Sequence, residues 1–332
     1  MARSRLFKRA SVWGAVVIAL LAAELPATAQ DAKELFGART LPAATAPAPI
    51  GFYSKGCLAG GIAIPTDGPT WQAMRLSRNR RWGHPDMIAL LDRLSREAAA
   101  QDGWPGLLVG DISQPRGGPM LSGHASHQIG LDADIWLTPM PNRRLTAQER
   151  EDTEAPSVLA DGSLQVDPNR WSEAHGRLIM RAASYPQVER IFVHPGIKQK
   201  LCDSYSGDRS NLGKVRPAYG HHYHFHIRMK CPPGSSGCTA QQPVAAGSGC
   251  DASLAWWFTE EPWAQPDDPP PAPPKPRITP LSDLPRACAQ VLDAAAPASE
   301  AAVTYASGTQ AAMPSSATGF APVPIPTPRP FQ

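Results

Sequence analysis

The segment from His222 to Lys230 constrains the fold of this chain more than any other part of the sequence. Polar and apolar residues alternate along it, which is the pattern of a β-strand with one buried face. The polar positions hold three histidines and an arginine, namely His222, His224, His226 and Arg228. The apolar positions, which we expect to point at the core, hold Tyr223, Phe225, Ile227 and Met229. Such a strand belongs in a sheet and presents a row of imidazoles on the face away from the core.

A second alternating segment covers residues 131–137. Its apolar positions are Leu131, Ala133, Ile135 and Leu137, and its other face carries Asp132, Asp134 and Trp136. If the two strands are neighbours, Asp134 and His226 can converge on one point, with His127 just before the strand. The side chains of His224 and His226 are about 7 Å apart at their roots. Two imidazoles and one carboxylate are a common zinc set, and three protein ligands leave a fourth position for water, as in catalytic sites.

Other readings of these residues are open. A histidine-rich tract can bind metal loosely without a defined site, although a floppy tract has no need of strand periodicity or an apolar opposite face. Three further histidines lack such a context and are expected to be structural or on the surface: His84, His175 and His194. Asp132 shares a face with Asp134, so it either accepts a hydrogen bond from an imidazole or is a solvated carboxylate.

The first 29 residues have the features of a secretory signal peptide. A basic start (Arg3, Arg5, Lys8 and Arg9) precedes an apolar run, and Ala27-Thr28-Ala29 offers small residues for cleavage before Gln30. The alternative is an uncleaved membrane anchor. The apolar run from Val12 to Ala23 is shorter than the ~20 residues needed to span a bilayer, which favours the cleaved signal.

Six cysteines follow the signal region, at positions 57, 202, 231, 238, 250 and 288. An even number of cysteines in an exported chain predicts disulfides, and six cysteines allow 15 complete pairings. A thiolate metal site is the alternative, but no pair has the two-residue gap of a zinc knuckle.

The chain divides by composition into five segments. These are the signal peptide (1–29), a flexible N-terminal segment (30–50), one folded domain (51–264), a Pro-rich linker with a segment around Cys288 (265–293) and a disordered Pro/Ala-rich tail (294–332). Within the domain, helices are expected at 85–101 and 172–184, and further strands at 107–112 and 190–194. These elements predict an α+β fold. The net charge of +3 is too small and too evenly spread to favour nucleic acid as a partner.

Four longer strings carry a family resemblance. They are SRNRRWGHP (77–85), SGHASHQIGLDADIWL (122–137), RIFVHPGIKQKLC (190–202) and KVRPAYGHHYHFHIRMKCP (214–232). The spacing of His127, Asp134 and His226 resembles the metal motifs of the lysostaphin, D-Ala-D-Ala metallopeptidase and hedgehog-like group. The strings themselves resemble the penicillin-insensitive murein endopeptidases, from about residue 50 to about residue 260.

The resemblance implies a central antiparallel sheet flanked by helices, and a zinc metallopeptidase domain over 51–264. It implies His127, Asp134 and His226 as zinc ligands, and His224 and His221 as residues that assist proton transfer. His124 matches a further metal-site position of the family, but we find no counterparts for the other ligands of a second ion, so one Zn²⁺ is expected. The family's disulfides carry over as Cys57–Cys288, Cys202–Cys250 and Cys231–Cys238.

The resemblance also implies a periplasmic zinc endopeptidase that cuts D-alanyl–meso-diaminopimelyl cross-links in peptidoglycan and is insensitive to penicillin. A homodimer is compatible with it, and no membrane contact is expected after signal cleavage. Two alternatives remain at this stage: a D-alanyl-D-alanine carboxypeptidase with the same metal chemistry, and a non-catalytic wall-binding zinc module.

Overall fold

The computed structural model describes residues 31–264 and 278–306, and it confirms an α+β fold. The signal region 1–29, residues 265–277 of the Pro-rich linker and the tail from 307 lie outside the described residues. The helices are α1 (Ala32–Gly37), α2 (Pro85–Glu97), α3 (Ala147–Asp152), α4 (Glu173–Ser184), α5 (Pro195–Ser204), α6 (Ala252–Ala255) and α7 (Ala287–Asp293). No helix in this described part combines the length and the apolar character that crossing a bilayer requires.

A mixed six-stranded sheet forms the centre of the molecule, with the strand order β4-β6-β7-β10-β8-β9. Its strands are β4 (Trp71–Ala73), β6 (Leu107–Val109), β7 (Asp132–Trp136), β10 (His224–Met229), β8 (Val188–Val193) and β9 (Val215–Pro217). The four central strands run antiparallel to one another, as expected, whereas the edge strands β4 and β9 pair in parallel with β6 and β8. Two small antiparallel pairs complete the strands: β1 (Ala48–Phe52) with β2 (Lys55–Ala59), and β3 (Ile62–Ala63) with β5 (Trp82–Gly83).

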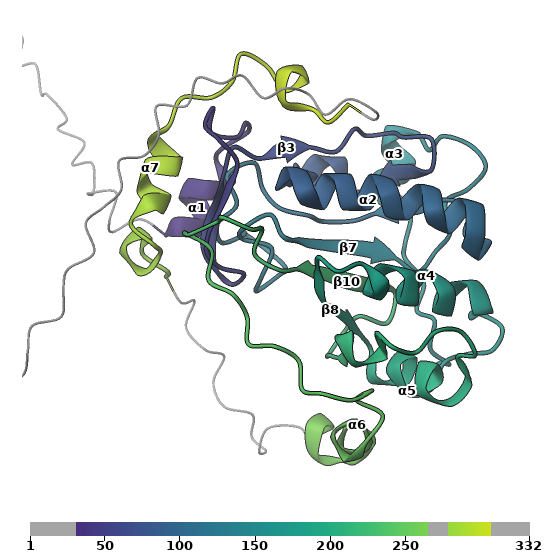
Figure 1. Ribbon diagram of the computed structural model, residues 1–332. Helices are drawn as coiled ribbons and strands as arrows, with labels where there is room; N and C mark the ends of the chain where they lie inside the picture. Colours follow the sequence, from purple (N-terminus) through teal and green to yellow (C-terminus); the bar gives the residue numbers. More distant parts are fainter. Residues whose placement is uncertain (1–30, 265–277, 307–332) are drawn as a thin grey trace, which may run out of the picture.

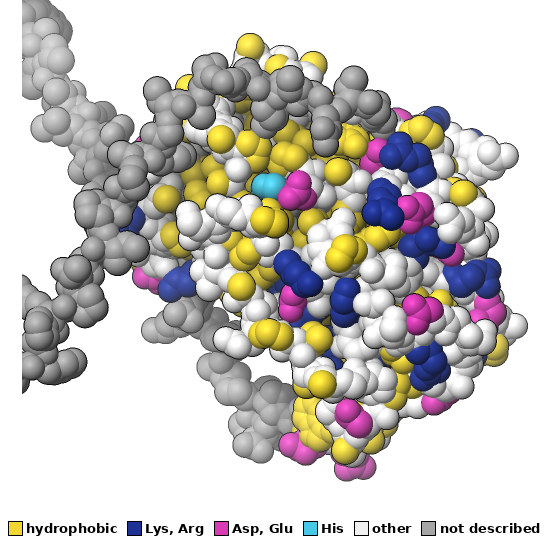
Figure 2. All heavy atoms as spheres, in the orientation of Figure 1, with side chains coloured by type: hydrophobic (Ala, Val, Ile, Leu, Met, Phe, Trp, Pro, Cys, Tyr) yellow, Lys and Arg dark blue, Asp and Glu magenta, His cyan; other side chains and the backbone are white. Residues whose placement is uncertain are grey.

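One face of this sheet is packed against α2 and α4, which lie in front of it in Figure 1. Ala133 and Ile135 of β7 and Phe225 and Ile227 of β10 are inaccessible to solvent and share one apolar core with both helices. Because side chains alternate along a strand, the acids of β7 and the histidines of β10 must point to the opposite face. On the outer face shown in Figure 2, Lys and Arg are interspersed with Asp and Glu, and no patch of one charge stands out.

The helix expected at 85–101 is α2, continued by a π-turn over Ala98–Asp102. Its N-cap is His84, whose Nδ1 accepts from the Asp86 amide at 3.2 Å, and His194 caps α5 in the same way. The ring of His175 contacts the carbonyl oxygen of Leu137 at 3.0 Å. These three histidines therefore have structural contacts, as their sequence context indicates.

The expected flexibility of residues 30–50 is wrong for the described part of that segment. Helix α1 is capped by Asp31, and its Phe36 is buried in a second apolar cluster with α7, β1 and β2. Arg116 donates hydrogen bonds to the carbonyl oxygens of Val291, Leu292 and Ala294, which ties α7 to the body of the molecule. Composition alone misleads here because one buried aromatic and one cap are enough to order a short helix that other elements cover.

The expected tail also begins later than residue 294. Residues 294–306 lie along the domain: the Tyr305 amide donates to Ala63 O at 2.9 Å, and its hydroxyl contacts Asp92 Oδ2 at 3.2 Å. The rest of the expected disordered tail, from 307, lies outside the described residues.

The three disulfides pair as the resemblance implies: Cys57–Cys288, Cys202–Cys250 and Cys231–Cys238. The first joins β2 to α7 across 231 residues, whereas the last closes a loop of only 7 residues. Chain-entropy arguments therefore give the first bridge a much larger effect on the unfolded state.

We expect the double variant Cys57→Ala/Cys288→Ala to lose roughly 5 kcal/mol of unfolding free energy, and Cys231→Ala/Cys238→Ala roughly 2–3 kcal/mol, from loop closure alone. Urea unfolding of both variants beside the wild type measures the two losses. Equal losses would show that the length of the closed loop does not set the stabilisation in this fold.

Candidate metal centre

The register of β7 and β10 brings the two predicted segments together. The strands are antiparallel neighbours, with His226 opposite Asp134 and Arg228 opposite Asp132. The convergence of Asp134 and His226 that the alternation predicted is therefore present. Both residues are at most 5 % exposed and lie on the sheet face away from α2 and α4.

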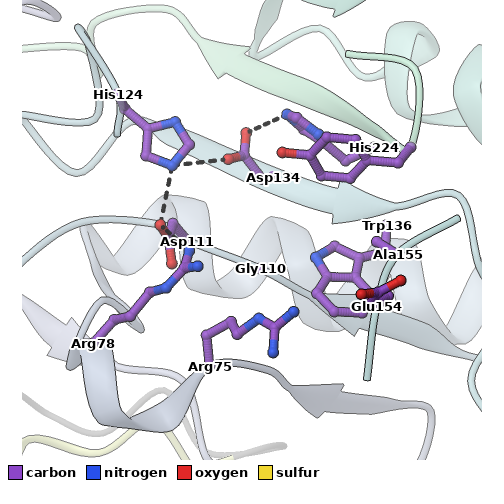
Figure 3. Close-up of a pocket in the computed structure, with 11 residues that line it drawn as sticks. Arg75, Arg78, Gly110, Asp111, His124, Asp134, Trp136, Glu154, Ala155 and His224 are labelled. Carbon is purple, nitrogen blue, oxygen red and sulfur yellow. Dashed lines mark hydrogen bonds and ion pairs between the residues drawn. The ribbon is translucent and has the colours of Figure 1, made fainter. Parts of the chain in front are cut away.

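Four imidazoles surround the Asp134 carboxylate. The nitrogen-to-oxygen distances to Asp134 are 3.4 Å from His127 Nε2, 3.4 Å from His226 Nδ1, 3.5 Å from His124 Nε2 and 3.7 Å from His224 Nε2. One ligand atom from each of His124, His127 and Asp134 lies within 4.8 Å of the others, a spacing that could hold a metal ion. Figure 3 shows His124 and His224 approaching Asp134 from opposite sides.

His221 lies at the edge of this group. Its ring centroid is 4.8 Å from that of His224 and 5.9 Å from that of His226, and its Nδ1 is 2.6 Å from the carbonyl oxygen of Tyr219. The structure thus gathers all six predicted site residues in one place.

Hydrogen bonds fix which nitrogen of two histidines faces Asp134. His127 Nδ1 donates to Ile112 O at 2.7 Å, so in the neutral ring the lone pair is on Nε2. His226 Nε2 donates to Asp132 Oδ1 at 2.9 Å, which leaves the lone pair on Nδ1. Both lone pairs point at Asp134, so each imidazole is oriented as a metal ligand requires.

Asp132 holds His127 and His226 in this arrangement by hydrogen bonds. Its carboxylate accepts from the His226 ring, from the His127 backbone amide at 2.9 Å and from Arg228 Nε at 2.7 Å. Burial opposes its ionisation, but Arg228 and His226 outweigh burial and hold the pKa of Asp132 far below its usual range. Of the two sequence readings, the structure therefore selects the hydrogen-bond acceptor over the solvated carboxylate.

The charges of the site fit a bound cation. Every ion pair of Asp134 within the described residues is with a histidine. His127 Nε2 and Asp134 Oδ1 are buried and have no hydrogen-bond partner in the part of the chain that the structure describes. Burial disfavours protonation of His127, yet the Asp134 carboxylate overrides it and raises the pKa of His127 to about 9. A divalent ion held by imidazole and carboxylate can replace that proton, and such donors suit zinc.

Asp134 and the imidazoles around it (the His/Asp cluster) open into a cavity of about 330 Å³. Its lining includes Asp134, His124 and His224, together with six residues that the sequence did not single out for a site: Arg75, Arg78, Asp111, Trp136, Glu154 and Tyr223. Asp111 Oδ2 is 3.0 Å from His124 Nε2, and although burial opposes it, His124, Arg80 and Arg78 lower the pKa of Asp111 to about 2. A sequence signal existed for Asp111, because it is a charged residue inside the predicted strand 107–112.

The expected strand over 222–230 is shorter at its start. His221 has a left-handed φ of +50°, and β10 begins only at His224. His222 therefore does not share the face of His224 and instead lies beside His194, with ring centroids 6.3 Å apart. Tyr223, expected in the core, lines the cavity.

Comparison with known proteins identifies the chain's relatives. The family model described as penicillin-insensitive murein endopeptidase matches residues 49–293. This chain belongs to that family. The match confirms the resemblance carried by the four strings, and it extends through Cys288.

Individual members of the murein endopeptidase family agree. A penicillin-insensitive murein endopeptidase of Haemophilus influenzae is 44 % identical over 245 residues, which is 74 % of this chain and 82 % of the relative. Proteins of the same name from Klebsiella pneumoniae and Yersinia enterocolitica are 40 % and 38 % identical, covering 74 % and 79 % of this chain and 85 % and 94 % of the relatives.

Replacing Asp132 by Asn tests the positioning of the two lone pairs. The amide retains one acceptor oxygen where the carboxylate serves the His226 ring, the His127 amide and Arg228, so we expect metal affinity to fall about 10- to 100-fold. Competition with a chromogenic chelator measures the affinity. Asp86→Asn, at a side chain that is 54 % exposed, is the control and should bind metal as the wild type does. Unchanged affinity in Asp132→Asn would remove Asp132 from the metal site.

Proposed function

We propose that this protein is a zinc-dependent murein endopeptidase that hydrolyses D-alanyl–meso-diaminopimelyl cross-links in peptidoglycan. The main support is the buried Asp134 carboxylate, at which two oriented imidazoles aim unshared lone pairs. The relatives named as penicillin-insensitive murein endopeptidases support the substrate class. Export to the periplasm fits the signal-like start of the sequence and the three disulfides.

His127, Asp134 and His226 are the proposed ligands of one zinc ion, and His124 lies where it can join them. Zinc bound there would polarise the scissile carbonyl and activate a water molecule. Burial lowers the pKa of His224 to about 4, so its ring is neutral at pH 7 and can accept a proton. The same residue would later pass that proton to the leaving amine, and His221, whose ring is next to that of His224, is the proposed alternate for either step.

This scheme explains the expected insensitivity to penicillin. β-Lactams inactivate peptidases by acylating a nucleophilic serine, and hydrolysis by an activated water needs no such serine. The cavity lining supports the scheme, since its described residues include histidines and acids but no serine.

Digestion of purified sacculi and of purified dimeric muropeptides, with and without a chelator, tests the proposal. An endopeptidase converts dimers into monomers, and the chelator stops it. Shortened stems without splitting of dimers would instead identify a D-alanyl-D-alanine carboxypeptidase. Binding to sacculi without any product would identify a non-catalytic wall-binding module.

A further inference from the structure

We propose that Arg75 and Arg78 form a carboxylate-binding subsite beside the His/Asp cluster. This subsite binds the free carboxylate of the substrate next to the scissile amide. This inference rests on the proposed function and names the part of the substrate that the cavity selects. Both arginines line the same cavity as Asp134 and His224, and Figure 3 shows them on the opposite side of it.

The turn that carries the two arginines is held in a fixed and costly conformation. Arg75 and Asn79, on either side of the short 3-10 turn Leu76–Arg78, have left-handed φ angles of +55° and +51°. Among the described residues, the only other non-glycine positions with positive φ are His127 and His221, both in the candidate site. Strain of this kind persists where the surrounding structure enforces it, and it is concentrated at functional sites.

Contacts with α3 and its flanks enforce this turn. Ser77 donates from its amide and its hydroxyl to the Glu151 carboxylate, at 2.9 and 2.8 Å. The Arg75 amide donates to Arg150 O at 3.1 Å. The guanidinium groups are therefore presented by a braced turn, which lowers the entropy lost when they bind a ligand.

Arg75 is a cation without a counter-ion inside the described structure. Its Nη2 donates to Thr153 O at 2.9 Å, and its guanidinium lies 5.5 Å from the centre of the Trp136 ring. No carboxylate of the described residues pairs with it, although Glu154 lines the same cavity. Arg78 donates to Asp111 Oδ2 through Nη1 at 3.2 Å, and its side chain is 47 % exposed. Donors on both arginines thus remain for an anion.

The chemistry of the proposed substrate supplies that anion. In a D-alanyl–meso-diaminopimelyl cross-link, the amide nitrogen is bonded to a carbon that also carries a free carboxylate. When the scissile carbonyl lies at the His/Asp cluster, this carboxylate lies against the neighbouring side of the cavity, where Arg75 and Arg78 are. A guanidinium matches a carboxylate with two parallel hydrogen bonds, which makes arginine the suitable reader. A cross-link in which this group is a carboxamide offers no negative charge.

The experiment uses the zinc-loaded full chain and two dimeric muropeptides, one with the free carboxylate and one in which it is a carboxamide. We expect the wild type to prefer the free carboxylate at least about tenfold in kcat/KM. Arg75→Gln should lose most of that preference, mainly through a higher KM for the free carboxylate, with unchanged zinc content. Arg75→Lys keeps the positive charge but lacks the two parallel N–H donors of a guanidinium, so it should retain part of the preference. Arg93→Gln, on the exposed side of α2, is the control and should keep all of it.

Two results overturn the subsite: equal cleavage of both dimers by the wild type, or an undiminished preference in both Arg75→Gln and Arg78→Gln. The second arginine keeps the test decisive if Arg75→Gln fails to fold. Cleavage of neither dimer by the zinc-loaded wild type has a different meaning, because it overturns the proposed function and this inference together.

Discussion

The His226→Ala protein should purify without stoichiometric zinc and should cut no cross-link. The imidazole is one of the two whose lone pair is aimed at Asp134, through a ring that Asp132 holds by Nε2. Its removal leaves two of the three proposed ligands, His127 and the buried Asp134 carboxylate. Three protein ligands are the usual minimum for catalytic zinc, so the ion should be lost on dialysis.

Metal analysis of the dialysed protein and muropeptide digestion measure the two losses. The wild type, stripped by a chelator and refilled with zinc, serves as the control, because its activity should return whereas that of His226→Ala should not. The near-ultraviolet circular dichroism spectrum should stay close to that of the wild type, since the core face of β10 is untouched. A His226→Ala protein that keeps one zinc per chain would exclude His226 as a ligand.

The shared face at the heart of the site could be predicted because it depends on a period of two. Once residues 131–137 and 222–230 are recognised as strands with one apolar face, Asp134 and His226 must lie on the other face. The register that sets them directly opposite each other does not follow from this period, because a shift by two residues keeps both apolar sets on the core. The alternation therefore predicts the shared face of Asp134 and His226, and the structure supplies their neighbourhood and register.

Two features of the site could not be predicted from the sequence. One departs from the period of two, and the other depends on contacts between residues far apart in the chain. The left-handed backbone of His221 ends the alternation early, which moves His222 away from the site and Tyr223 into the cavity. A positive φ at a histidine has no reliable local signal. Arg75 and Arg78 reach the cavity through a strained turn that residues of α3 brace, and no periodicity predicts contacts between residues so far apart.

The predicted flexibility of the two flanking segments is wrong for a related reason. Residues 31–50 and 294–306 are rich in small residues, and composition assigns such stretches to flexible chain. Their order comes from tertiary contacts, among them the burial of Phe36 and the hydrogen bond from Tyr305 to Ala63. The Cys57–Cys288 bridge, which the family resemblance implies, is the one indication in the sequence that the segment around residue 288 lies next to β2.

His224→Ala should retain zinc while its activity falls by about 100- to 10,000-fold, the usual contribution of a general acid–base residue. Of the four histidines that contact Asp134, His224 is the farthest, at 3.7 Å, and its buried Nδ1 has no hydrogen-bond partner among the described residues. Its ring therefore adds little to holding the ion but lies next to the reacting atoms, with a neutral form at pH 7.

The matched control is His222→Ala, two residues earlier on the chain and outside the cavity lining, which should keep both zinc and activity. Zinc content and initial rates on purified dimers separate the two variants. Loss of zinc from His224→Ala would make His224 a ligand rather than a base. Full activity in the zinc-loaded His224→Ala protein would leave His221 as the residue that moves the proton. The double variant His221→Ala/His224→Ala should then be inactive, and activity in it would exclude both histidines as the base.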